Sequence, residues 1–172
     1  FFGVESGSER MLQKMNKRIP YDKIEETFSN CRKAGIIAIG SFIVGFPGET
    51  EEAFKELVDF VREVKFDRMG AFTYSEEDDT WAQRHLSDDI PQDVKQERLD
   101  ILMAAQEDVA LSLNEQMIGQ CVKVIVDRIE GDRYVGRTQW DSPEVDPEVY
   151  FPINDTDYDE GDFVMVRLTQ AY

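Results

Sequence analysis

Cysteine and histidine are scarce in this 172-residue sequence, which contains only Cys31, Cys121 and His85 of these two types. Two cysteines so far apart make neither a disulfide framework nor a metal-binding cluster. We therefore expect each to be a small buried hydrophobic residue in a reducing compartment. A single histidine excludes a histidine-built metal site within the chain, and His85 has no serine or cysteine partner at an interpretable spacing. We predict no catalytic residue and no metal ligand.

Long hydrophobic runs are also missing. No segment approaches the roughly 20 apolar residues of a membrane span, and no basic leader precedes a short apolar stretch as in a signal peptide. The first residue is Phe1 instead of a methionine, which we interpret as a piece of a longer protein. With 41% hydrophobic and 32% charged residues, the sequence predicts one medium or two small folded domains. We expect a cytoplasmic protein without membrane association.

Positive charge is in short supply, since the net charge is −17. Residues 1–48 have a net charge of +2, residues 49–116 of −12 and residues 117–172 of −7. An acidic surface repels the phosphates of nucleic acids and attracts a basic partner. The alternative is that the acidity serves solubility alone.

The first two thirds of the sequence alternate between strand and helix patterns. We predict strands over 1–4, 36–44 and 69–74, and helices over 9–17, 20–33 and 50–64. The apolar run over 36–44 is typical of a strand buried on both faces. This order favours a parallel sheet with helices outside, open or curled into a partial barrel. A long acidic loop over 75–90 and a helix over 91–117 follow.

From Gly119 onward, apolar residues recur with period two. We predict strands over 122–126, 134–136, 149–151 and 163–168, with a hairpin turn at Gly131. Such short strands indicate a small β-barrel. The sequence ends soon after the last strand, so a closing strand is expected to be lacking. Exposed strand edges invite pairing, which predicts a homodimer.

Two turns that follow predicted strands are candidate ligand sites. Glycines in Gly45-Phe46-Pro47-Gly48, directly after Val44, allow a close approach of the backbone to a ligand. Glu5-Ser6 occupies the same place one unit earlier. Ligands bind at this end of the strands in parallel α/β folds. Phe72 and Tyr74 could stack on a planar base. The alternatives are ordinary turns, a helix entry and core aromatics.

These segments together carry a family resemblance. Residues 3–9 and 42–51 resemble the fourth and fifth strand motifs of radical S-adenosylmethionine (radical SAM) enzymes. Residues 66–75 and 136–146 resemble methylthiotransferases of the RimO type, and the barrel from Gly119 resembles their TRAM domain. The resemblance implies the C-terminal half of a TIM-like partial β/α barrel over 1–116, followed by an OB-like TRAM β-barrel over 118–172.

The resemblance also implies ligands for both parts. S-adenosylmethionine would be bound by residues of the two turns and the third strand, namely Glu5, Ser6, Val44, Gly45, Phe46, Pro47, Gly48, Phe72 and Tyr74. The substrate would dock on the barrel through Arg137, Asp141, Glu144 and Asp146.

The activity that the resemblance implies is methylthiolation of an aspartate in a small-subunit ribosomal protein, with two 4Fe-4S clusters in the intact enzyme. The cysteines that would bind these clusters are absent, so we expect the chain alone to be inactive. The acidic barrel favours a basic ribosomal protein over RNA. The alternatives are a tRNA methylthiotransferase of the MiaB type and a non-catalytic interaction module.

Overall fold

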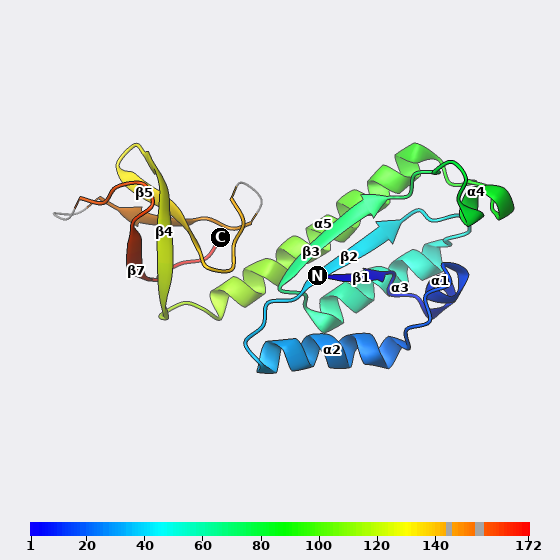
Figure 1. Ribbon diagram of the computed structural model, residues 1–172, viewed down its shortest axis with the longest axis horizontal. Coiled ribbons are helices and arrows are strands. Elements are labelled where there is room, and N and C mark those ends of the chain that lie inside the picture. The colour runs from blue at the N-terminus through cyan, green and yellow to red at the C-terminus, as the bar shows by residue number, and fades with distance from the viewer. Residues whose placement is uncertain (144–145, 154–156) are drawn as a thin grey trace. The chain divides into compact units, whose positions relative to one another are not determined.

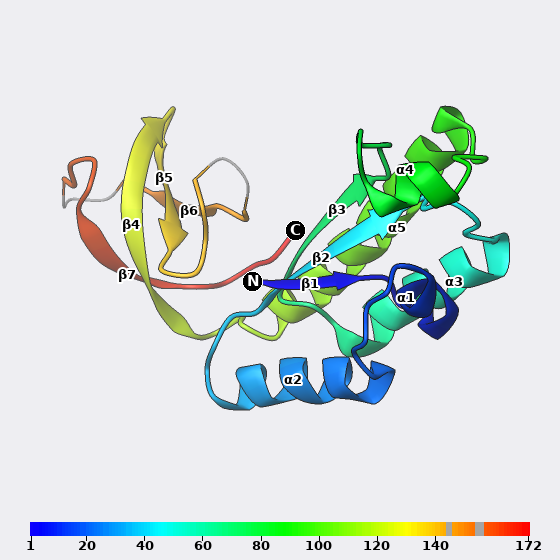
Figure 2. The same ribbon diagram turned by 45° about the vertical axis from the view of Figure 1, so that its right-hand side comes forward.

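A computed structural model describes residues 1–143, 146–153 and 157–172. The chain forms two compact units, Phe1–Leu113 and Asn114–Tyr172, which Figures 1 and 2 show from two directions. The predicted domain assignment, with boundaries at 116 and 118, stays a prediction. Glu144, one of the predicted docking residues, lies outside the described residues.

The first unit is built on a parallel sheet of three strands. These are β1 (Phe2–Glu5), β2 (Ile39–Val44) and β3 (Arg68–Thr73), in the order β1-β2-β3. The helices α1 (Glu9–Lys14) and α2 (Tyr21–Lys33) connect β1 to β2, and α3 (Glu51–Val64) connects β2 to β3. The helices α4 (Trp81–His85) and α5 (Gln92–Glu115) follow. This arrangement confirms the predicted parallel sheet with helices outside it.

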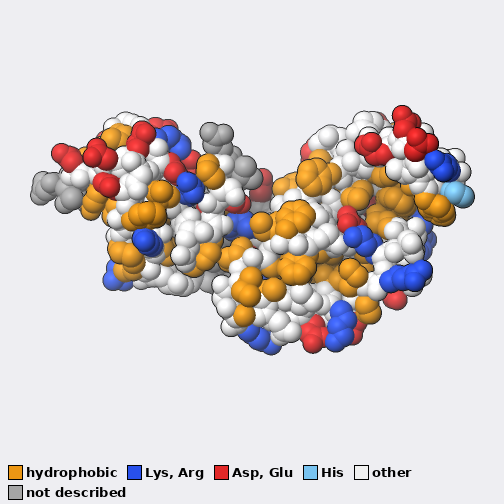
Figure 3. Space-filling view, in the orientation of Figure 1, with side chains coloured by type: hydrophobic (Ala, Val, Ile, Leu, Met, Phe, Trp, Pro, Cys, Tyr) orange, Lys and Arg blue, Asp and Glu red, His pale blue; other side chains and the backbone are white. Residues whose placement is uncertain are grey.

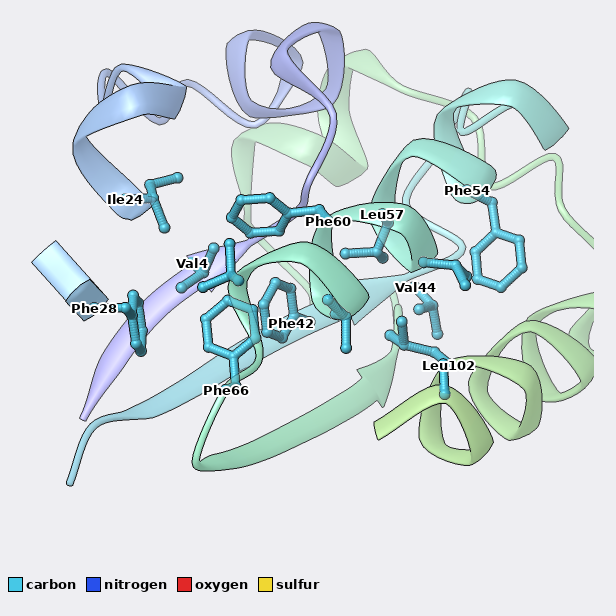
Figure 4. Packing of buried hydrophobic residues seen from close by; sticks show 14 of the residues in the cluster. Val4, Ile24, Phe28, Phe42, Val44, Phe54, Leu57, Phe60, Phe66 and Leu102 are labelled. Atoms are coloured by element: carbon cyan, nitrogen blue, oxygen red, sulfur yellow. The ribbon is translucent and has the colours of Figure 1, made fainter. Parts of the chain in front are cut away.

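One face of this sheet holds the main hydrophobic core (Figure 4). Phe42 and Val44 of β2 are completely buried there. They share one cluster with side chains from all three long helices, including Phe28 of α2, Phe60 of α3 and Leu102 of α5. The rings of the cluster pack edge to face, as Phe42 and Phe66 do with 5.2 Å between their centroids. Burial of this one face is the main force that holds the sheet and its helices together.

The predicted strand with two buried faces is wrong. β2 begins at Ile39, and Ile36 before it is 56% exposed. Burial along β2 alternates, because the three long helices pack against one face only. The other face carries Ile43 and the neighbouring Phe72 of β3, which is 64% exposed. The apolar run therefore indicates that these residues favour a strand, but it does not show that both faces of the strand are buried.

Two other boundaries differ from the prediction. The acidic segment over 75–90 is not a plain loop, because it contains α4. The Thr80 hydroxyl caps this helix by accepting a hydrogen bond from the Gln83 amide at 3.2 Å. The first helix ends at Lys14 and not at Lys17, and Asn16 beyond it adopts a left-handed backbone with φ of 58°.

The second unit is a curled antiparallel sheet (Figure 1). Its strands are β4 (Cys121–Glu130), β5 (Arg133–Thr138), β6 (Val149–Pro152) and β7 (Phe163–Arg167), in the order β6-β5-β4-β7. The inner face buries Val122, Val124, Val126, Tyr134 and Phe151. Gly131 makes the predicted hairpin turn with φ of 63°. The curled four-stranded sheet has the form of a half-barrel, which confirms the predicted β architecture.

Among the described residues, no helix combines the length and the apolar character needed to cross a membrane.

Candidate functional site

A hollow of about 430 Å³ lies at the carboxyl ends of the three parallel strands. It is lined by residues of all three strands and of the segment after β3, namely Glu5, Ser41, Phe42, Ile43, Phe72, Thr73, Tyr74, Ser75 and Glu77. Figure 3 shows hydrophobic side chains gathered over this sheet and acidic side chains at the end of the unit that carries α4. Parallel α/β folds bind their ligands at this end of the strands.

The strand register explains why the hollow is open. Gly3, Ser41 and Gly70 are neighbours across β1, β2 and β3. Side chains alternate along a strand, so this row of small residues lies on the same face as Ile43 and Phe72, two positions further on. The row of small residues leaves space above the sheet, and the larger side chains at the strand ends border that space.

Glu5 closes one side of the hollow in an unusual backbone conformation. Its φ of 72° is left-handed, which costs a non-glycine residue about 1 kcal/mol. Lys17 Nζ lies 2.8 Å from Glu5 Oε1 and donates to the Gly3 carbonyl at 3.3 Å. A Cβ atom on Gly3 would lie only 2.7 Å from Glu5 Oε1. The glycine and the lysine together hold the Glu5 carboxylate over the open face of β1.

The opposite side of the hollow is negatively charged. Burial raises the pKa of the Tyr74 hydroxyl, and the charges of Glu76, Asp88 and Glu77 raise it further. Glu76 and Glu77 are exposed, and Glu77 itself lines the hollow. The hollow therefore combines two carboxylates with hydroxyl groups and aromatic rings, which suits a ligand with positive charge and a planar group.

The turn after β2 is organised by a buried ion pair. Glu49 Oε2 accepts hydrogen bonds from the Gly45 amide at 2.9 Å and from Arg98 Nη1 of α5 at 2.8 Å. Arg98 Nη1 also donates to the Glu49 carbonyl at 3.2 Å. Burial raises the pKa of Glu49, and its contacts with Gly45 and Arg98 oppose that rise. Gly45 and Gly48 have φ of 72° and 78°, where glycine is strongly favoured.

The structure brings only some of the predicted cofactor residues together. Glu5, Phe72 and Tyr74 line the hollow. The Val44 side chain points into the helical core, and residues 45–48 form the adjoining turn outside the lining. Ser6 is buried, where its hydroxyl accepts a hydrogen bond from the Ser8 amide at 3.2 Å.

Gly7 explains the burial of Ser6. A Cβ atom on Gly7 would lie 2.6 Å from Phe60 Cβ and 2.9 Å from Leu57 Cα, so the turn after β1 packs directly on α3. This close approach draws the neighbouring Ser6 into the protein, away from the hollow.

Several residues that line the hollow were not predicted from the sequence. Ser41, Ile43, Ser75 and Glu77 all line the hollow. The period-two alternation of β2 could have identified Ser41 and Ile43, since they face away from the buried Phe42 and Val44. The roles of Lys95 and Arg98 of α5 could not be predicted from the sequence, because charged residues on a long helix usually face solvent.

The predicted docking residues of the second unit make contacts within that unit. Arg137 Nε lies 3.2 Å from Asp127 Oδ1 on β4. Asp141 is buried and accepts hydrogen bonds from the Thr138 hydroxyl at 2.5 Å and from the Thr138 amide at 3.3 Å. Asp146 accepts from the Ser142 amide at 2.7 Å. Asp141 and Asp146 thus stabilise the chain after β5.

The two cysteines belong to different units. Cys31 is half-buried on α2 of the first unit, whereas Cys121 is exposed on β4 of the second. The expectation that both are buried is wrong for Cys121, because it alternates with the buried Val122 and Val124 and faces outward. The described part of the chain contains no group of three or more potential metal-ligating side chains.

Comparison with known proteins gives a family match for each of the two units. Residues 1–61 match the radical SAM superfamily, and residues 118–172 match the TRAM domain. Over 166 residues, 95% of its length, the chain is 48% identical to the ribosomal protein uS12 methylthiotransferase RimO of Bacteroides thetaiotaomicron. The chain is therefore similar to RimO proteins over nearly its whole length.

Other RimO proteins show the same similarity. The identity is 48% to the protein of Phocaeicola vulgatus and 46% to that of Parabacteroides distasonis, each over 166 residues and 95% of this chain. The chain spans 38% of the length of each of these three RimO relatives.

The buried ion pair gives a stability prediction. Arg98→Met should lower the free energy of unfolding of the first unit by about 3 kcal/mol, because Glu49 would stay buried without its cation. The double variant Glu49→Gln with Arg98→Met should recover part of this loss. Urea unfolding, followed through amide signals of the first unit, measures both. Arg62→Met, at an exposed position of α3, is the control, with a change within about 0.5 kcal/mol. Equal effects of Arg62→Met and Arg98→Met would contradict the prediction.

Proposed function

We propose that this chain is the binding part of a methylthiotransferase that modifies an aspartate of a small-subunit ribosomal protein. The hollow of the first unit would bind the adenosine side of S-adenosylmethionine, and the TRAM unit would dock the protein substrate. The observation that carries the proposal is the hollow at the carboxyl ends of β1, β2 and β3, of which β1 and β2 lie in the segment, residues 1–61, that matches the radical SAM superfamily. The relatives are named as methylthiotransferases of ribosomal protein uS12, so we propose a substrate of that kind and a cytoplasmic location.

The residues around the hollow fit S-adenosylmethionine in chemical character. This ligand has a sulfonium and an ammonium group. Glu77 offers a carboxylate to these cations, and Glu5, which is ion-paired with Lys17, offers further acceptor oxygens. The hydroxyls of Ser41, Thr73 and Ser75 suit ribose hydroxyls, and the rings of Phe72 and Tyr74 suit the adenine. When bound, S-adenosylmethionine supplies the methyl group and the chemistry that activates a C–H bond. In this proposal the chain's own residues hold and orient the ligand.

An iron–sulfur cluster does not fit the described residues. A cluster needs several neighbouring thiolates, and the two cysteines belong to different units. No step through a cluster follows from these residues. We therefore propose that this chain is inactive by itself and that its contribution is binding.

The charge of the TRAM unit supports a basic protein substrate. Residues 117–172 have a net charge of −7. Exposed acidic residues occur in its turns, among them Asp132, Asp159, Glu160 and Asp162. Such a surface attracts a basic protein and repels phosphates.

One observation favours RNA as the second candidate. Phe163 on β7 is 63% exposed, and Lys123 Nζ lies 4.1 Å from the centre of its ring. An exposed aromatic ring beside a cation can stack on a base and contact a phosphate.

The ligand proposal is tested by titrating the chain with S-adenosylmethionine and with its thioether analogue, S-adenosylhomocysteine, which lacks the sulfonium charge. We expect amide shifts at Ile43 and at residues 72–77 in NMR spectra. Glu77→Gln should weaken binding of S-adenosylmethionine about fivefold and binding of S-adenosylhomocysteine less, because the analogue keeps the ammonium group and lacks the sulfonium charge. Glu97→Gln, exposed on α5, is the control. No shifts at millimolar ligand would overturn the adenosine site.

The substrate proposal is tested by binding of a purified basic small-subunit ribosomal protein and of a tRNA to the full chain. The acidic surface predicts binding of the protein that weakens as salt rises. Asp159→Asn with Glu160→Gln should reduce this binding, whereas Glu56→Gln, exposed on α3, should not. Tight, salt-sensitive tRNA binding that is lost in Phe163→Ala, without binding of the protein, would favour the RNA alternative.

We also propose that two copies pair through exposed strand edges. β7 is an edge strand of its sheet in the described part of the chain, and Met165 on it is 65% exposed. A lysine on an edge strand disfavours pairing, so Met165→Lys should shift the mass in light scattering toward one chain. Leu111→Lys on α5 is the control. A wild-type mass of one chain at high concentration contradicts the proposal.

A further inference from the structure

One buried lysine of α5 joins the two ends of the segment that carries α4. Lys95 Nζ donates a hydrogen bond to the Tyr74 carbonyl at 3.1 Å and to Asp88 Oδ2 at 2.6 Å. Tyr74 comes directly before residues 75–87, and Asp88 comes directly after them. The same ammonium group therefore contacts both ends of this 75–87 segment.

The surroundings of Lys95 are shaped to hold it in this place. The residue is only 2% exposed, and its aliphatic carbons lie against Gly45. A Cβ atom on Gly45 would overlap Lys95 Cγ. The Tyr74 ring lies 5.2 Å from Nζ. The turn after β2, the end of β3 and the end of the 75–87 segment thus meet at one side chain.

The 75–87 segment has its own internal order. Within it, the Thr80 hydroxyl donates to the Glu77 carbonyl, Gln83 Nε2 donates to Asp78, and Arg84 pairs with Asp79. These contacts shape the segment without attaching it to the sheet. Its attachments include Ala82 and Leu86, which pack with Met11, Phe46 and Ala53, and the two ends at Lys95. Just beyond the second end, Asp89 Oδ1 accepts a hydrogen bond from the Gly48 amide at 3.3 Å.

The segment matters because it forms one side of the hollow. Ser75 and Glu77 line the hollow directly. The Tyr74 amide donates to the Val44 carbonyl at 2.8 Å, and the Tyr74 ring packs on Phe46 with 5.1 Å between centroids. The end of β3 is therefore held by β2 on one side and by Lys95 on the other. Ser75 and Glu77 come next in the chain, so their positions depend on this end.

We propose that Lys95 is a positioning residue that places Ser75 and Glu77 beside the ligand without touching the ligand itself. The physical argument is that a buried ion pair is a poor source of stability, because an apolar pair of the same size often stabilises a fold as well or better. The contacts of Lys95 with Asp88 and the Tyr74 carbonyl instead fix the positions of the two ends of the 75–87 segment, which apolar packing alone would not determine. The role in ligand binding rests on the proposed function.

Hydrogen exchange of the full chain tests the positioning role. Lys95→Met keeps the packing on Gly45 and removes the ammonium. It should speed exchange of the protected amides at 74–88 about tenfold and those of α3 and β2 by less than about twofold. Lys55→Met, exposed on α3, is the matched control and should change neither group. Equal acceleration across the first unit, or none at 74–88, would overturn the proposal.

A second variant keeps the test decisive if Lys95→Met folds poorly. Asp88→Ala removes only one of the two acceptors, at a position with a partly exposed side chain. Exchange should then rise near residues 86–89 and change little at Tyr74 and Ser75. Acceleration of the same size at both ends would contradict the separate contacts that define the role of Lys95.

Ligand titration separates this inference from the proposed function. If the wild-type chain binds S-adenosylmethionine, Lys95→Met should weaken binding about tenfold, and Lys55→Met should leave it unchanged. Unchanged binding by Lys95→Met would overturn the inference and leave the adenosine site intact. If the wild-type chain does not bind, the adenosine site and the ligand role of Lys95 both fail, and hydrogen exchange alone decides whether Lys95 positions the segment.

Discussion

One-sided packing of the three-stranded sheet is the constraint on which the first unit depends. Phe42 and Val44 point into a core shared with α2, α3 and α5, and burial of such aromatic and aliphatic side chains supplies most of the favourable free energy. Because side chains alternate, the same register that buries Phe42 also presents Gly3, Ser41 and Gly70 on the opposite face. The hollow is therefore a direct consequence of the core.

Polar contacts then shape the rim that the apolar core cannot specify. Hydrophobic packing has no direction, whereas hydrogen bonds and ion pairs hold groups at defined positions. Arg98 holds the turn after β2 through Glu49, Lys95 holds the end of β3 and the 75–87 segment, and Lys17 holds Glu5. Two of these three cations come from α5, so this helix contributes both to the core and to the geometry of the hollow.

The order of strands and helices was predictable, and so was much of the hollow's location. The glycine turn after Val44 and the aromatic residues at the end of β3 pointed to the carboxyl ends of parallel strands, and Glu5, Phe72 and Tyr74 line the hollow there. Ser6 was not expected to be buried, because its burial depends on the contact of Gly7 with α3. Lys95 and Arg98 could not be recognised, since a charged residue on a helix carries no local sign of a buried partner 21 or 49 positions away.

The sequence alone indicated the family resemblance, the two kinds of architecture and the acidic character of the chain, because motifs, periodicity and charge are local or additive properties. The tertiary structure decided which side chains border the hollow and that Cys121 faces outward. It also decided that Asp141 and Asp146 accept hydrogen bonds from backbone amides of their own loop. These outcomes depend on strand register and on contacts between distant residues. A shift of one residue in register reverses the face of every side chain, and no single segment contains that information.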